Sequence, residues 1–143
     1  MPILAQNGGT AVATSGCMDC YFAACPLPEQ NDLGKSAVVL FNIPELGIRF
    51  KAPFAAVDGN HSDLASLLAL LEFIDSNQKY FTNRTFQIYG HNLAIINMLN
   101  GRQPIDERFE PLLDKAKNYR SKYHFSLEWV PPKDNSALDS LLG

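Results

Sequence analysis

The sequence is short of positive charge and has no long apolar run. Its 143 residues include 12 Lys and Arg against 15 Asp and Glu, which gives a formal charge of -3. Nucleic-acid binders commonly carry a basic face that releases counterions, so any such face must be local here. No stretch approaches the roughly 18 apolar residues of a membrane span, and MPILAQNGGT lacks the features of a signal peptide. These absences predict a cytoplasmic protein with no membrane partner.

Cysteine is also scarce, and its three copies are close together. Cys17, Cys20 and Cys25 all lie in GCMDCYFAAC, and there is no fourth. A C-x-x-C pair is half of a zinc ribbon or a redox motif, but a ribbon needs a second pair. The apolar and aromatic DCYFAAC is typical of a buried strand, in which free cysteine is a common core residue. We therefore expect no metal at these thiols, and three unpaired thiols suit a reducing compartment.

The first half of the chain has the pattern of a β-meander followed by a helix. At 46% hydrophobic composition, 143 residues are enough for one domain with a sizeable core. Residues 19–25, 36–43 and 47–54 are rich in Val, Ile and aromatics and are separated by polar turns, which predicts three antiparallel strands. HSDLASLLALLEFIDS, residues 61–76, has apolar residues at helical spacing and Ser62 as the predicted cap.

Strands and helices alternate in the second half. TFQIYG, residues 85–90, predicts a strand, and Asn92 is placed to cap a short helix that ends at Gly101. A helix over residues 105–123, with a break or start at Pro111, precedes an alternating strand at residues 124–130. Residues 136–143 form a last predicted helix.

This order predicts an α/β fold, a five-stranded mixed sheet with helices on both faces. Right-handed crossovers place residues 85–90 parallel to the first strand. The predicted core consists of Leu67, Leu68, Leu71, Ile88, Ile95, Leu127 and Trp129.

Four stretches resemble the ribonuclease H family. CYFAACPLPEQNDLGKSAVVLF is similar to its first hairpin and DLASLLALLEFI to its first helix. YGHNLAIINMLNG is similar to its fourth strand and following helix, and WVPPKDNSALDSLL to its closing motif. The resemblance covers about residues 19–143 and implies one ribonuclease H-like domain over 1–143, with 1–18 as an N-terminal extension. The family implies nucleases that cut the RNA strand of a hybrid, or relatives that use the fold for other nucleic-acid work.

The resemblance also implies a site for two magnesium ions roughly 4 Å apart, held by several carboxylates. The matching positions hold Ala23 (or Ala24, if the register shifts by one), Ser66, His91 and Asp139. Only Asp139 is an acid, and one carboxylate cannot hold two magnesium ions. We therefore expect a catalytically inactive domain without a cofactor, acting as a nucleic-acid-binding or protein-assembly module. Each substitution also has a simpler interpretation, such as a core alanine or a solvent-facing histidine.

The alternative is a divergent, metal-dependent nuclease for RNA:DNA hybrids. His91 and Asp139 could be joined by a third acid from Asp19, Asp58 or Asp63. Imidazole plus carboxylate suits zinc or manganese better than magnesium, and magnesium would be required only if this alternative held. Convergence of these side chains within metal-bridging distance would favour the enzyme.

The densest basic run is KAKNYRSKY, which starts at residue 115. At helical spacing it could track phosphates and stack on bases. Nearby acids dilute the charge, and a solvated helix face is the alternative interpretation. The candidate nucleic-acid-binding residues are Lys115, Lys117, Tyr119, Arg120 and Lys122.

Overall fold

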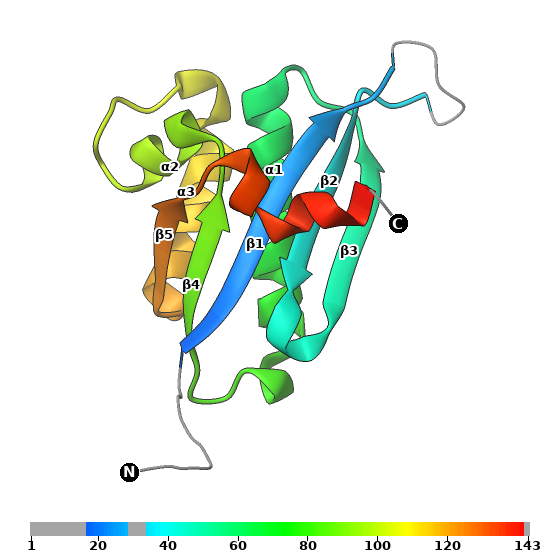
Figure 1. The fold of residues 1–143 in the computed structure, drawn as a ribbon. Helices are drawn as coiled ribbons and strands as arrows, with labels where there is room; N and C mark the ends of the chain where they lie inside the picture. Colours follow the sequence, from blue (N-terminus) through cyan, green and yellow to red (C-terminus); the bar gives the residue numbers. More distant parts are fainter. Residues whose placement is uncertain (1–16, 29–33, 142–143) are drawn as a thin grey trace.

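The chain forms one five-stranded sheet in the order β3-β2-β1-β4-β5 (Figure 1). The computed structural model describes residues 17–28 and 34–141. The strands are β1 (Cys17–Pro26), β2 (Ala37–Ile43), β3 (Ile48–Phe54), β4 (Thr85–Gly90) and β5 (Phe125–Trp129). β1, β2 and β3 form an antiparallel meander, and β4 is parallel to both β1 and β5. The predicted mixed sheet and the parallel placement of β4 are confirmed.

Three α-helices pack on one face of this sheet. They are α1 (Gly59–Ser76), α2 (Leu93–Leu99) and α3 (Glu110–Lys122), and their buried residues share one core with the inward side chains of the sheet. Short 3-10 turns, η1 (Pro44–Leu46), η2 (Gln78–Tyr80), η3 (Glu107–Phe109) and η4 (Pro132–Asp134), connect the elements. Within the described residues, no helix is long and apolar enough to cross a membrane.

The opposite face, called the outer face below, is covered only in part. The 3-10 helix η5 (Ser136–Leu141) crosses it over β1, β2 and β3 (Figure 1). A second, smaller core of Ala23, Val38, Leu40 and Ala137 lies beneath η5. Helices on both faces are thus confirmed, with a 3-10 helix as the last element. β2 is buried along its whole length because it is covered on both faces.

The start of α1 differs from the prediction. The helix begins at Gly59, because the Asp58 carboxylate caps it by accepting from the His61 amide at 2.9 Å. Ser62 is buried instead, and its hydroxyl donates to the Gly59 carbonyl at 2.9 Å. The prediction that Ser62 is the cap is therefore wrong, and the helix starts about one turn earlier. Two capping residue types four positions apart made either start compatible with the sequence.

The start of α2 and six of the seven predicted core residues are confirmed. Asn92 caps α2 by accepting from the Ile95 amide at 3.2 Å, and Gly101 follows the helix with φ of +74°. Trp129 is the wrong core prediction, because its side chain is 46% exposed at the end of β5 and its indole nitrogen donates to the His91 carbonyl at 3.2 Å. The buried six are Leu67, Leu68, Leu71, Ile88, Ile95 and Leu127.

The predicted N-terminal extension, 1–18, falls mostly outside the described residues. Its last two residues belong to β1, which begins at Cys17, two positions before the predicted strand.

Candidate functional site

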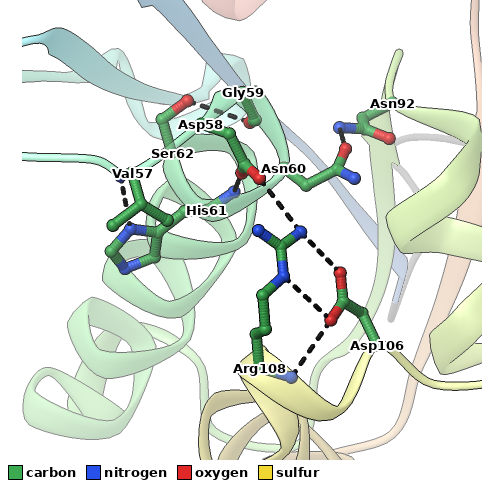
Figure 2. Close-up of polar contacts among 9 residues, drawn as sticks. All are labelled: Val57, Asp58, Gly59, Asn60, His61, Ser62, Asn92, Asp106 and Arg108. Atoms are coloured by element: carbon green, nitrogen blue, oxygen red, sulfur yellow. Dashed lines mark hydrogen bonds and ion pairs between the residues drawn. The ribbon is translucent and has the colours of Figure 1, made fainter.

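The candidate site is the corner where the parallel strands β1 and β4 end beside the first turn of α1. We define the corner as Ala24, Asp63, His91 and Asn92. The Asn92 amide nitrogen donates to Asp63 Oδ2 at 2.8 Å and to Asn60 Oδ1 at 2.9 Å; Figure 2 shows the latter bond. The Ala24 backbone also hydrogen bonds to the Asp63 carboxylate, and the nearby His91 acts on that carboxylate electrostatically.

Asp63 is the one carboxylate of this corner. Burial raises the pKa of Asp63, and the hydrogen bond from Asn92, the nearby His91 and the Ala24 backbone act against that rise. Its negative charge is therefore met by amide donors and an imidazole. No second carboxylate stands beside it among the four corner residues, so the donor set does not fit two magnesium ions.

The structure places Ser66 away from this corner. Ser66 is fully buried on the inner side of α1, the helix to which it belongs. Its hydroxyl donates to the backbone carbonyl of Asp63 at 2.6 Å. The side chain of α1 that reaches the strand ends is Asp63, one turn earlier. The family resemblance had matched Ser66 to this position, and Asp63 entered the sequence analysis only as a possible third acid of the metal-dependent alternative.

The two candidate alanines of β1 point to opposite faces of the sheet. Ala23 is fully buried in the small core under η5, whereas Ala24 is half-buried on the same side as α1 and hydrogen bonds to Asp63. The register with Ala24 is therefore the one that faces the corner. In either register, the position holds a methyl group and no metal ligand.

His91 is held by an amide. Its Nδ1 lies 3.0 Å from the side-chain nitrogen of Asn135, which also donates to the Phe22 carbonyl at 2.9 Å. Asn135 Oδ1 accepts from the Ala137 amide at 3.1 Å, so this buried side chain ties η5 to both β1 and the corner. Because the Asn135 side-chain nitrogen is a donor, His91 Nδ1 is placed to accept from it. The sequence signal for this contact was the Asn of WVPPKDN.

The other acids of the metal-dependent alternative do not join the corner. Asp139 is exposed on η5, and Asp19 is exposed on the outer face of β1. Asp58 caps α1 and pairs with Arg108 at 3.1 Å; Arg108 also pairs with Asp106 at 2.8 Å (Figure 2). Among residues 17–28 and 34–141, no three His, Cys, Asp or Glu side chains converge on a common metal position. The proposed combination of His91, Asp139 and a third acid is not assembled.

A hollow of about 410 Å³ opens beside the corner. Ala24 and Asp63 line it together with Ser36, Asp58 and Ser62. Its walls come from the end of β1, the start of β2 and the first turns of α1. A ligand in this hollow would therefore meet two carboxylates, two serines and small apolar side chains. The Asp58 carboxylate is already engaged by the His61 amide and by Arg108.

Most of the predicted nucleic-acid-binding residues on α3 have partners within the protein. Lys115 pairs with Glu72 at 2.8 Å and Lys122 with Asp75 at 2.6 Å, and both acids belong to α1. Arg120 donates to the Leu99 carbonyl at 2.9 Å and stacks over Phe125. Tyr119 packs against the core and Lys117 is exposed. The acids of α1 thus neutralise much of the charge of the predicted basic face.

The cysteines do not form a joint site. Cys17 is exposed and Cys20 is buried, because residues three apart in a strand point to opposite faces. Burial, the largest cause, raises the pKa of the Cys20 thiol to about 12. Cys25 is partly buried. This arrangement agrees with the core-strand interpretation of DCYFAAC.

A meander followed by helix-linked parallel strands places the chain in the α/β class. No protein-family model and no curated protein matches the sequence. Solved structures do match. Ribonuclease H1 of the archaeon Halobacterium salinarum has a TM-score of 0.68 at 17% identity, with 88% of this chain and 94% of that chain covered. The chain has the ribonuclease H-like fold.

Two further structures give the same result. LC11 ribonuclease H1, in complex with an RNA/DNA hybrid, has a TM-score of 0.65 at 12% identity, covering 88% of this chain and 99% of that one. The N-terminal ribonuclease H domain of a Mycobacterium tuberculosis protein has a TM-score of 0.68 at 16% identity, covering 89% and 91%. At such low sequence identities, a shared fold does not establish a shared activity.

Proposed function

We propose that this chain is a catalytically inactive ribonuclease H-like domain that works as a binding module. The observation that carries the proposal is the corner itself, where Asp63 is the only carboxylate and its oxygen is bonded by the Asn92 amide at 2.8 Å. Two-metal hydrolysis needs several carboxylates on shared ions. Alanine at position 24 and histidine at position 91 cannot supply them to magnesium.

Nucleic acid is the first partner class to test. The fold likeness to a ribonuclease H1 that was solved with an RNA/DNA hybrid supports it. The surface of α3 supports only a weak contact, because Lys115 and Lys122 already pair with acids of α1. A protein partner is the second class. Both partner classes are compatible with a domain that has the ribonuclease H-like fold but not the carboxylates of a two-metal site.

The deciding experiment is a cleavage assay on a labelled RNA:DNA hybrid in magnesium and, separately, in manganese. We expect no cleavage in either metal, and an active ribonuclease H1 serves as the positive control. Metal-dependent cleavage that is lost in His91→Ala and Asp139→Asn would establish the divergent nuclease instead.

Binding is measured on the same hybrid without metal. Lys117→Gln should weaken any binding about twofold to threefold, since one exposed phosphate contact is removed. Glu110→Gln, on the same helix, is the control and should not weaken it. If the hybrid does not bind at all, an RNA:DNA hybrid is excluded as the partner, and the protein-assembly function is the one to test next.

A further inference from the structure

Part of the outer face of the sheet, over β4 and β5, is left uncovered. η5 crosses β1, β2 and β3, while the α-helices pack on the other side, so none of the described helices lies over the outer side of β4 and β5 (Figure 1). The side chains there alternate with the buried ones of the core. We define the open face as the outward residues of this region: Asp19, Tyr21, Thr85, Gln87, Tyr89, Ser126 and Glu128.

Two tyrosines form the centre of the open face. The rings of Tyr21 and Tyr89, which are direct neighbours on β1 and β4, stack with their centroids 5.1 Å apart and their planes at 26°. The Tyr89 hydroxyl donates to Gln87 Oε1 at 2.8 Å, which fixes that ring. Both side chains are only partly buried. Stacked rings held in place on a sheet provide a rigid aromatic surface for a ligand.

The charges around the tyrosines are acidic. Burial, and after it the neighbouring carboxylates of Asp19 and Asp134, raise the pKa of Tyr21. Burial raises the pKa of Tyr89 as well, and Asp19 and Glu128 contribute to that rise. These carboxylates therefore act on the same two rings. Arg49 shares the outer face but lies two strands from Tyr21, on β3.

One polar group on the open face, the Ser126 hydroxyl, lacks a hydrogen-bond partner among the described residues. Ser126 lies opposite Gln87 in the β4–β5 register, and its hydroxyl oxygen is buried with no hydrogen-bond partner among the described residues. An unpaired buried hydroxyl costs stability unless something else bonds to it. Ser126 also lines a hollow of about 360 Å³ at the edge of this face, together with Thr85 and Gln87 of β4 and with Arg120 of α3 and His124. The hydroxyl oxygen is itself buried, so it is an unsatisfied group beneath this face and not an exposed contact.

We propose that the open face binds an arginine-rich segment of a partner protein. A guanidinium group stacks on aromatic rings and pairs with carboxylates at the same time, which matches the two tyrosines and Asp19, Glu128 and Asp134. Phosphate groups would be repelled by the same carboxylates, so nucleic acid does not fit this face. Residues 1–16 contain no lysine or arginine, so they do not supply the segment.

The inference rests on the proposed binding function, but it uses a different part of the molecule. The proposal depends on Tyr21, Tyr89 and the carboxylates beside them, and not on the exposed Lys117 of α3 that the hybrid assay tests. Arg120 of α3 does reach the hollow at the edge of the open face. A failed hybrid-binding assay would leave this proposal standing. If the open face does not bind the peptide, the proposal that the corner is catalytically inactive is likewise unaffected. The two proposals are therefore tested separately on the same protein.

The test measures binding of a fluorescent oligo-arginine peptide by anisotropy, at low and at physiological salt. The first variant, Asp19→Asn with Glu128→Gln, should weaken binding about fivefold to tenfold, since two carboxylate partners are lost. The matched control, Glu110→Gln with Asp114→Asn, removes two exposed acids of α3 and should change affinity less than about twofold. Equal weakening by both pairs would mean general charge attraction and would overturn the proposal.

The aromatic contribution is tested by a second pair of variants. Tyr21→Leu with Tyr89→Leu should weaken binding of the peptide about threefold to tenfold, because the aromatic ring faces are removed. Tyr21→Phe with Tyr89→Phe keeps the rings and should bind the peptide like the wild type. The phenylalanine variant keeps the test valid if the leucine variant unfolds, because a loss of binding there would contradict ring stacking. Binding of a labelled RNA:DNA hybrid that depends on these tyrosines would assign the face to nucleic acid and would also overturn the proposal.

Discussion

Gly90 lies directly against the ring of Phe22. A Cβ atom on Gly90 would stand 2.4 Å from Phe22 Cζ, far inside any normal contact. The same Phe22 offers its carbonyl to Asn135, which in turn holds His91. The closeness of β4 to β1 at this point therefore sets the position of the corner, and it depends on the absence of a side chain at residue 90.

We expect Gly90→Ala to destabilise the protein by about 1 to 3 kcal/mol, because the new methyl group must displace a fully buried ring in a packed core. Urea unfolding followed by circular dichroism measures the loss. Gly59→Ala is the control, since no heavy atom outside its chain neighbours and its own helix backbone lies within 4 Å of the added Cβ, and it should be nearly neutral. Equal stability of Gly90→Ala and the wild type would contradict the close contact.

Asp63 gives a prediction about pH. Burial raises its pKa above the usual 3.8, so as pH rises through that value the unfolded chain loses its proton first. The wild type then loses stability relative to Asp63→Asn, until the pH passes the raised folded pKa. Unfolding free energies of both proteins from acid to neutral pH give this difference. If the unfolding free energy of the wild type instead rises relative to that of Asp63→Asn, then Asn92 and His91 lower the pKa of Asp63 by more than burial raises it.

Asp75 is the matched control for that measurement. The hydrogen bonds from Lys122 and then Tyr123 hold the pKa of Asp75 below its usual value. Its contribution is present above 3.8 and is lost as pH falls through the folded pKa. Asp75→Asn should therefore lose stability relative to the wild type as pH rises, the opposite slope to Asp63→Asn.

The cysteines are predicted to differ in reactivity. The thiolate is the reactive form, and burial raises the pKa of Cys20 to about 12, whereas Cys17 is exposed at the start of β1. A thiol reagent added to the folded protein at neutral pH should label Cys17 rapidly and Cys20 only after denaturant is added. Peptide mapping by mass spectrometry assigns each label. Rapid labelling of Cys20 in the folded state would mean that β1 is not buried as described.

The sequence predicts the strands and their order well, because each element has its own periodicity and crossover handedness restricts the topology. It predicts the corner less well, because a site depends on single positions. Asp58 and Ser62 are equally good caps by residue type, and the pattern did not separate them. The family resemblance separately matched Ser66, whereas the α1 side chain at the corner is Asp63. Trp129 alternates correctly with Leu127, yet it lies past the core. Periodicity reports which side a residue faces and cannot report where the covering layer ends.

The register of the corner can be tested by rebuilding its carboxylates. Ala24→Asp with His91→Asp would place two acids beside the native Asp63, and three carboxylates at the strand ends should bind magnesium. The control, Ala23→Asp with His91→Asp, puts its new carboxylate in the fully buried core under η5. We expect the control to be destabilised by several kcal/mol, since an unpaired charge is buried there, and to take up no magnesium. Isothermal calorimetry with magnesium, run beside urea unfolding, separates the two. Uptake by the Ala23 variant, or none by a folded Ala24 variant, would show that the strand ends do not carry the site at Ala24.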